Sequence, residues 1–216
     1  MSLKQKRLAM LSLAVPLLGI GVGLFLFAGL GSDPYTAFNL AVAAKTGIDF
    51  GTMSLINNAV LLVLILFFHR HTLGAGTVLN MIFVGYIADY FMKICSRFFG
   101  APQNLFQQLL VMMAGVITLS LSASLYFTAA LGLAPYDTMA FMVQRIIRLP
   151  FAWCRILTDT TSLVLALLLG GSAGVGVGTF VCACCLGPFI NFFNNKLSIP
   201  LLGAARVRPD MAEEKE

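Results

Sequence analysis

Long apolar runs separated by short polar breaks dominate the chain from residue 8 to residue 195. A helix that spans a bilayer needs about 20 mostly apolar residues. Three runs meet this requirement together with their flanks, and three more are apolar but more broken. The pattern therefore predicts six transmembrane helices, at Leu8–Leu30, Met53–Phe68, Leu105–Leu131, Thr77–Ile94, Ile156–Leu169 and Gly178–Phe193.

Two shorter apolar stretches follow breaks that contain proline. They are Tyr35–Thr46 and Tyr136–Ile147. A helix of about 12 residues covers roughly 18 Å, well short of the roughly 30 Å hydrocarbon core. Segments of that length are typical of re-entrant or interfacial helices. The predicted fold class is all-α: a polytopic helical membrane protein with six transmembrane helices plus two half-length helices.

The positions of the basic residues leave open an alternative with eight crossing segments. Cytoplasmic loops carry an excess of Lys and Arg. With six spans and the N-terminus inside, Lys45, Lys93 and Arg97 fall outside, whereas with eight segments only Arg70 does. We choose six, because the missing hydrophobic length of the short stretches is the stronger constraint.

The second half of the chain echoes the first. The break that ends in Pro34-Tyr35 is matched by the break that ends in Pro135-Tyr136, at an offset of 101 residues. Further on, Gly76-Thr77 is matched by Gly178-Thr179 at an offset of 102. The glycines at these positions are small residues of the kind that let membrane helices approach closely.

These matches predict two internal repeats, at about residues 8–98 and 104–195. Alignment on the glycine-threonine pairs places Asn57 opposite Asp159. Three crossings per unit would make the repeats inverted, and four would make them parallel.

Composition agrees with a membrane protein and excludes several other classes. Hydrophobic residues make up 59% of the chain and charged residues 11%, whereas soluble domains carry about a quarter charged residues. The net charge of +5 comes from scattered Lys and Arg without a recognition motif, so no nucleic acid is expected. We expect a single transmembrane domain over residues 8–195, between a cytoplasmic N-terminus at 1–7 and a charged cytoplasmic tail at 196–216.

The N-terminal segment resembles a signal peptide but is predicted to be the first span. Lys4, Lys6 and Arg7 precede the apolar run, and that run is longer than the 7–15 or so residues of a signal-peptide core. The basic residues before this helix predict a cytoplasmic N-terminus.

Sequence signals for enzymes, metals and disulfides are absent. The five cysteines are an odd number and lie in or beside apolar runs, so we interpret them as packing residues. No HExxH or Gly-x-Ser-x-Gly motif occurs. We expect no enzyme activity, no metal site and no cofactor.

Three short motifs resemble a known family. They are Gly31-Ser-Asp-Pro-Tyr35, Gly47-Ile-Asp-Phe-Gly51-Thr52, and Gly74-Ala-Gly76-Thr77 with Asn80. The chain is similar here to the YczE/YitT-like integral membrane proteins of bacteria, although Tyr35 stands where tryptophan is common. The resemblance covers about residues 8–195 and implies a multi-pass protein of the bacterial cytoplasmic (inner) membrane. The family has no settled activity to carry over.

Ionisable residues at membrane depth are costly and are functional candidates by default. Asp159 lies one helical turn after Arg155, so the two can pair. In the first half, Asn57 and Asn58 place amide groups at the equivalent depth. The alternative is structural: Arg155 extends to the interface and Asp159 pairs with it, while the asparagines join helices.

The two proline breaks are the other candidate site. A proline in the first turn starts a helix cleanly, and the N–H groups there favour an anion. The acidic side chains beside them would cap these helices or favour a cation. The alternative is a capped turn without a ligand. The residues concerned are Asp33, Pro34, Tyr35, Pro135, Tyr136 and Asp137.

These features predict a small secondary transporter, or permease-like protein, that binds a small-molecule solute between the repeats. The alternative is a non-transporting membrane module that binds a lipid or a partner subunit. The expected partners are the lipid bilayer and the solute, with a homo-oligomer or a partner subunit left open.

Overall fold

The computed structural model describes residues 2–68, 73–149, 151–170 and 174–203, and nearly all of them are helical. No strand occurs within these ranges. The helices are α1 (Leu3–Ala28), α2 (Pro34–Thr46), α3 (Phe50–Phe68), α4 (Ala75–Phe99), α5 (Leu105–Ala129), α6 (Pro135–Ile147), α7 (Phe151–Leu168), α8 (Val177–Phe193), the π-helix η3 (Asn194–Ser198) and α9 (Ile199–Leu202).

The all-α prediction is confirmed, and each expected apolar segment is a helix. Among the described residues, four helices are long and apolar enough to cross a membrane: Leu3–Ala28, Phe50–Phe67, Ala75–Phe99 and Leu105–Ala129. Helices α2 and α6 have 13 residues each, close to the half-length expected. The number of six crossings stays a prediction.

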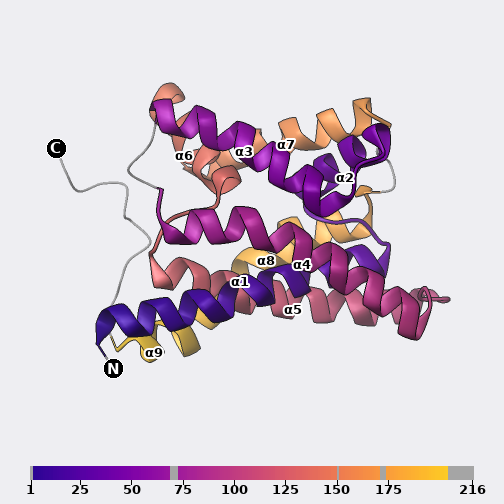
Figure 1. Ribbon diagram of the computed structural model, residues 1–216, viewed down its shortest axis with the longest axis horizontal. Helices are drawn as coiled ribbons and strands as arrows, with labels where there is room; N and C mark the ends of the chain where they lie inside the picture. Colours follow the sequence, from indigo (N-terminus) through magenta and orange to yellow (C-terminus); the bar gives the residue numbers. More distant parts are fainter. Residues whose placement is uncertain (1, 69–72, 150, 171–173, 204–216) are drawn as a thin grey trace.

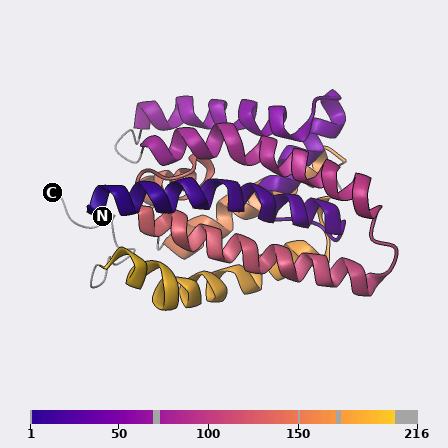
Figure 2. The ribbon, with the colours of Figure 1, turned by 60° about the horizontal axis from the view of Figure 1, so that its bottom comes forward.

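The helices fall into two groups. Helices α1, α4, α5 and α8 form one group, in which α1 packs on α4 and α5, and α5 packs on α8. Helices α2, α3, α6 and α7 form the other (Figure 1). The packing of α3 on α4 joins the two groups. In Figure 2, α1 lies between α4 and α5 along most of its length. Figure 1 also shows α2 and α6 near opposite ends of the molecule.

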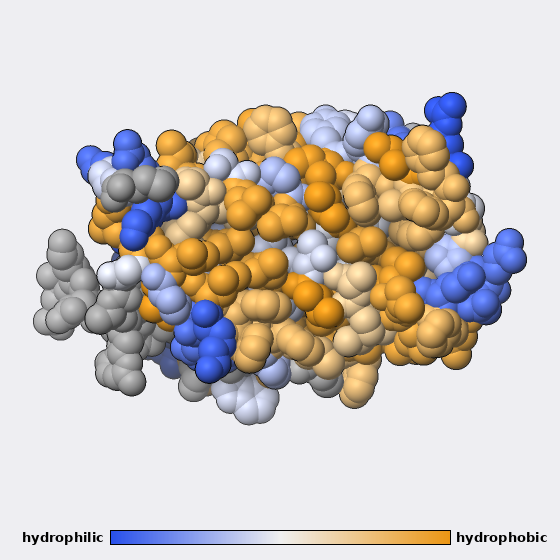
Figure 3. All heavy atoms as spheres, turned by 90° about the horizontal axis from the view of Figure 1, so that it is seen from below, coloured by the Kyte–Doolittle hydropathy of each residue, from blue (hydrophilic) through white to orange (hydrophobic). Residues whose placement is uncertain are grey.

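The outer surface is apolar over a broad band. Figure 3 shows this band between charged groups at both ends of the molecule. Large apolar side chains are exposed on the molecule, such as Phe67 at 80%, Phe180 at 72% and Trp153 at 63%. An apolar patch of this extent is not found on a soluble monomer, and it matches a hydrocarbon environment. The chain is therefore a multi-pass membrane protein in contact with the lipid bilayer.

The two short helices begin alike and differ in how they are capped. Both carry proline at their first positions. The Asp33 carboxylate caps α2 by accepting a hydrogen bond from the Thr36 backbone N–H at 3.0 Å. In α6 the cap is Ala134, which has no side-chain hydrogen bond. Asp137, which we considered as a cap, instead lies in the first turn of α6.

The helical structure extends beyond residue 195, into the segment 196–216 that the sequence predicts to be a tail. The π-helix η3 and helix α9 continue from α8 and dock on the domain. The Ser124 hydroxyl donates to the Asn194 amide oxygen at 2.7 Å, and Leu202 is only 2% exposed. Apolar burial and paired polar groups therefore hold residues 194–203 against α5 and α1. The rest of the predicted tail lies outside the described residues.

Candidate functional site

The first turns of α2 and α6 meet in a pair of stacked tyrosines. The Tyr35 and Tyr136 rings lie with their centroids 4.2 Å apart and their planes at 11°. Each tyrosine follows directly after the proline that starts its helix. Pro34 and Pro135 therefore act by fixing the helix starts that bring the two rings together.

Each tyrosine hydroxyl donates a hydrogen bond to the long helix that follows its own short helix. The Tyr35 hydroxyl donates to the Asn58 side-chain oxygen at 3.1 Å. The Tyr136 hydroxyl donates to the Asp159 carboxylate at 2.6 Å. The two bonds join residues with the same separation of 23 positions. The structural counterpart of Asp159 is therefore Asn58.

Our alignment of Asn57 with Asp159 was wrong by one residue. The Asn57 amide group donates instead to the Asn39 side-chain oxygen, at 2.6 Å. Asn39 lies on α2 and is 1% exposed. The Asn57 bond therefore joins α3 to α2. It lies beside the bond of the neighbouring Asn58 to Tyr35 and is not part of the tyrosine pair.

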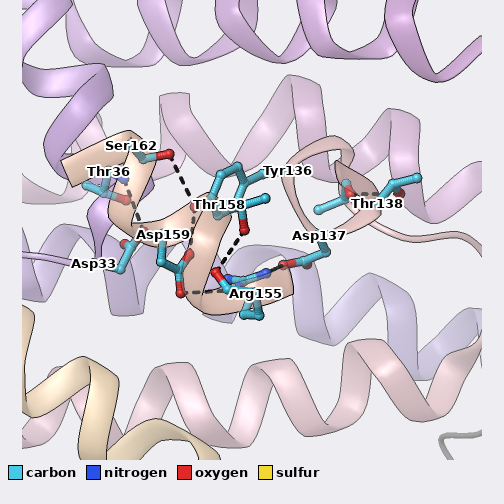
Figure 4. A network of polar contacts seen from close by, with 10 residues as sticks. Asp33, Thr36, Tyr136, Asp137, Thr138, Arg155, Thr158, Asp159 and Ser162 are labelled. Carbon is cyan, nitrogen blue, oxygen red and sulfur yellow. Dashed lines mark hydrogen bonds and ion pairs between the residues drawn. The ribbon is translucent and has the colours of Figure 1, made fainter. Parts of the chain in front are cut away.

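Arg155 lies at the centre of a charged network in the second half of the chain (Figure 4). Its Nη1 contacts the Asp137 carboxylate at 2.7 Å, and its Nε contacts the Asp159 carboxylate at 3.3 Å. Its guanidinium carbon lies 4.9 Å from the centre of the Tyr136 ring, within the range of a cation–π contact. The sequence predicted the Arg155–Asp159 pair, while the contact with Asp137 is new.

The charged groups of the network are only partly buried. The side chains of Arg155, Asp159 and Asp137 are 35%, 30% and 24% exposed. Tyr136 is 9% exposed. The network thus combines a buried tyrosine ring with a guanidinium and two carboxyl groups that remain partly accessible.

Asp33 joins this network from α2. Figure 4 shows its carboxyl group beside Asp159. The first half thereby adds a third carboxylate to a site whose other charges come from the second half.

Of the ten candidate residues, seven share this site, two prolines position it, and Asn57 lies beside it. The seven are Asp33, Tyr35, Asn58, Tyr136, Asp137, Arg155 and Asp159. Sequence reasoning missed Ser162, whose hydroxyl donates to the Tyr136 hydroxyl oxygen at 3.3 Å. Ser162 lies one helical turn after Asp159 and so on the same helix face, and this spacing could have identified it from the sequence.

Two sets of backbone contacts hold the breaks before α2 and α6. The Gly178 N–H donates to the Leu30 carbonyl at 2.7 Å, and the Ser32 N–H donates to the Gly174 carbonyl at 3.0 Å. These bonds tie the first break to the start of α8. We call them, together with their counterparts described next, the crossed backbone contacts.

The counterparts tie the second break to the start of α4. The Gly76 N–H donates to the Leu131 carbonyl at 2.8 Å, and the Thr77 hydroxyl donates to the Leu133 carbonyl at 2.7 Å. Each break is thus bound by a helix start from the other half of the chain. The positions of the two tyrosine rings depend on both sets of contacts, because each break leads directly into the proline and tyrosine that start a short helix.

The described residues contain no group of three or more His, Cys, Asp or Glu side chains arranged to hold a metal ion. Four cysteines, Cys95, Cys154, Cys182 and Cys185, are free thiols. The site's own chemistry is that of carboxylates, one guanidinium and hydroxyl groups. Such groups suit the binding of a small polar or charged molecule.

Comparison with known proteins gives a family without an assigned activity. A model described as a family of unknown function, DUF6198, matches residues 5–195. An uncharacterized protein of Haemophilus influenzae is 33% identical over 193 residues, covering 89% of this chain and 85% of that protein. No solved structure matches the chain.

A second relative links the family to membranes. The uncharacterized membrane protein YczE of Bacillus subtilis is 28% identical over 193 residues, covering 89% of this chain and 86% of that protein. The expected resemblance is confirmed. The chain belongs to the DUF6198 family, a YczE-like family of membrane proteins whose function is unsettled.

Proposed function

We propose that the protein is a small secondary transporter of the bacterial inner membrane, with a small solute bound where α2 and α6 meet. One observation carries this proposal: two half-length helices from different halves of the chain start side by side, at a partly accessible charged network. Transporter sites typically lie at such junctions, because broken helices present polar groups there at mid-depth.

The arrangement of the long helices supports two inverted repeats. If the halves are repeats, α1 corresponds to α5. These two helices run antiparallel, since Gly21 packs against Leu119 while Gly115 packs against Phe25. Several other contacts occur in matched pairs: α2 with α7 and α3 with α6, or α1 with α4 and α5 with α8. The contact of α3 with α4 is an exception, since the described parts of α7 and α8 have no contact of similar extent.

One ion pair supports six crossings. Lys93, near the end of α4, contacts Asp49 in the turn between α2 and α3 at 3.2 Å. Helices α1 and α4 run parallel, because Gly19 packs against Ile87 and Gly23 against Phe91. The turn after α2 therefore lies at the end of the molecule opposite to the N-terminus. A six-span arrangement requires this position, whereas eight crossings would return α2 to the N-terminal end.

Cysteine labelling tests this topology. In a Lys45→Cys variant, we expect a membrane-impermeant thiol reagent to react from outside intact cells. In a Lys6→Cys variant, we expect a reaction only after the membrane is opened, because the N-terminus is cytoplasmic in this proposal. The native protein, with its own cysteines, measures the background. Protection of both positions would contradict six crossings and favour eight.

A solute can be sought by its effect on stability. Any molecule that binds the folded protein raises its thermal stability by mass action. A panel of amino acids, organic cations, organic anions and sugars is screened on the purified protein. Molecules that stabilise it are then tested for uptake into liposomes that contain the protein alone.

For such a solute, we expect Asp159→Asn to reduce flux at least tenfold while the protein stays folded. The substitution removes a charge that binds Arg155 and accepts the Tyr136 hydrogen bond. Asp49→Asn is the control, because Asp49 is an exposed acid at the end of the molecule, with its side chain 69% exposed. Full flux in Asp159→Asn would remove this carboxylate from the mechanism.

The second candidate, a module that binds a lipid or a partner subunit, predicts a different result in the same liposomes. Binding without uptake, for every stabilising molecule in the panel, would favour it over transport.

A further inference from the structure

We infer that the outer face of α6 and α7 binds one anionic phospholipid, with an acyl chain in an apolar groove and the phosphate beside Arg148. This inference goes beyond the proposed function, because it concerns the surface that faces the lipid and not the solute site. Four observations lead to it.

The first observation is an apolar groove along the start of α7, next to the end of α6. Its volume is about 260 Å³, slightly below the roughly 300–1,000 Å³ of pockets for drug-sized ligands. The residues that line it are Ile147, Leu149, Trp153, Cys154, Ile156, Leu157 and Thr160. None of these side chains is charged and most are aliphatic, so the groove suits a hydrocarbon chain better than a polar solute.

The second observation is the position of the groove along the molecule. Helix α2 ends at the end opposite to the N-terminus, and Ala166 of α7 packs against Ala37 and Ala41 of α2. Helix α7 has 18 residues and is therefore about 27 Å long. Its start, and the groove, thus lie toward the N-terminal end of the molecule. Figure 1 agrees, since α6 and α2 lie near opposite ends.

The third observation is the charge at this end. Arg148 lies between two residues that line the groove, and Arg145 lies in the last turn of α6. Both arginines are exposed, and none of the ion pairs among the described residues includes either of them. The start of α1 adds Lys4, Lys6 and Arg7 at the same end.

The acids of the described part of the chain lie either in the charged network or toward the opposite end. They are Asp33, Asp137, Asp159, Asp49 and Asp89. The end that carries the groove is therefore basic. Basic residues near the membrane surface attract anionic lipids by about 1 kcal/mol each, so the charge here complements an anionic headgroup.

The fourth observation is the backbone of Arg148. Its φ is 58°, in the left-handed region where residues other than glycine are uncommon. The corresponding residue in the first half of the chain is Gly47, with a φ of 72°. Glycine adopts this conformation without steric cost. The chain thus carries a charged side chain beside the groove at a backbone position that favours glycine.

Trp153 indicates the depth at which the headgroup lies. This residue lines the groove and is 63% exposed, and tryptophan is enriched where a membrane protein crosses the interface between water and hydrocarbon. The lining residues of α7 continue from Trp153 to Thr160. The groove therefore runs from the level of the headgroups toward the bilayer interior, which is the path of an acyl chain.

The test uses the purified full-length protein in detergent, with phosphatidylglycerol and phosphatidylcholine of the same acyl chains as the probes. We expect phosphatidylglycerol at ten times its Kd to raise the melting temperature by about 3–6 °C. Phosphatidylcholine at the same concentration should raise it less, and native mass spectrometry should show one bound phosphatidylglycerol. Equal shifts with the two lipids would overturn the inference, because the site would then not select an anionic headgroup.

An Arg148→Gly variant separates lipid binding from folding. Glycine suits the positive φ, so this variant should melt near the native temperature when no lipid is added. Its affinity for phosphatidylglycerol should fall about fivefold through the loss of one basic group, while its affinity for phosphatidylcholine stays the same. The control is Arg97→Gln, which changes an exposed basic residue in the last turn of α4. An unchanged affinity in Arg148→Gly would contradict the placement of the headgroup.

Two neighbouring threonines test the placement of the acyl chain. Both are exposed, but Thr160 lines the groove and Thr161 does not. We expect Thr160→Trp to fill the groove and weaken the binding of phosphatidylglycerol, and Thr161→Trp to leave it unchanged. Equal binding in the two variants would contradict the groove as the site. A dimer without bound lipid in the native mass spectrum would overturn the inference and assign the groove to a second copy of the chain.

These measurements are independent of the proposed function, since none of them uses solute flux. A failure of the lipid site would leave the transporter standing, and a protein that moves no solute could still show the selective binding of phosphatidylglycerol.

Discussion

A Gly178→Ala variant is expected to lose about 3 kcal/mol of unfolding free energy, the upper end of the usual cost of overpacking. A Cβ atom at this position would lie 2.4 Å from the Gly31 carbonyl oxygen and 2.9 Å from its carbon. Both are backbone atoms, so no side chain can rotate away. The break cannot shift easily either, because the Gly178 N–H itself binds the Leu30 carbonyl.

The matched control is Gly187→Ala in the same helix. A Cβ atom there would meet nothing within 4 Å, and alanine is favoured over glycine inside a helix by roughly 0.5–1 kcal/mol. We expect this variant to be as stable as the native protein or slightly more so. Denaturant unfolding of the purified proteins in detergent measures both. Equal stability of the two variants would contradict the close approach of α8 to the first break.

An Arg155→Met variant is expected to lose about 2–3 kcal/mol, near the lower end of the cost of removing one partner from a buried ion pair. Methionine fills similar space but leaves the Asp137 and Asp159 carboxylates without their shared partner. The partial exposure of these groups reduces the cost through solvent screening. Replacing Asp137 by asparagine in the same variant should restore part of the loss, because it removes one of the uncompensated charges.

Asp49→Asn is the control for this prediction. Asp49 contacts Lys93 at 3.2 Å, and the two side chains are 69% and 55% exposed. Exposed ion pairs contribute only about 0–1 kcal/mol. We therefore expect a much smaller loss than for Arg155→Met in the same unfolding experiment. Equal losses would show that the network at Arg155 is no more than a surface ion pair.

Hydropathy and proline positions predicted the helices well, because both act locally. An apolar run must form a helix when its backbone has no water to bind, and proline starts a helix at a definite residue. The pairing of Arg155 with Asp159 was predictable for the same reason, since residues four apart share a helix face.

Contacts between helices could not be predicted in this way. Asp137 lies on α6 and contacts Arg155 on α7. The spacing of the two residues along the sequence does not indicate this contact. Asn57 and Asn58 are adjacent and equally polar, so an alignment offset of 101 or 102 decides which one is opposite Asp159. Only the hydrogen bond from Tyr35 distinguishes them.

The position at which the helical domain ends could not be predicted from the local sequence pattern either. The residues after α8 are polar, which is typical of a tail, yet they continue as a π-helix. The side chains of Asn194 and Ser198 form hydrogen bonds with serine and threonine hydroxyl groups on α5.

The crossed backbone contacts impose an order on biosynthesis. The Leu30 carbonyl emerges from the ribosome 148 residues before its partner, the Gly178 N–H. The first break therefore stays incompletely bonded until α8 has been inserted. The first half alone would lack the backbone that closes its own break, so two separately expressed halves should become stable only when made together in one membrane.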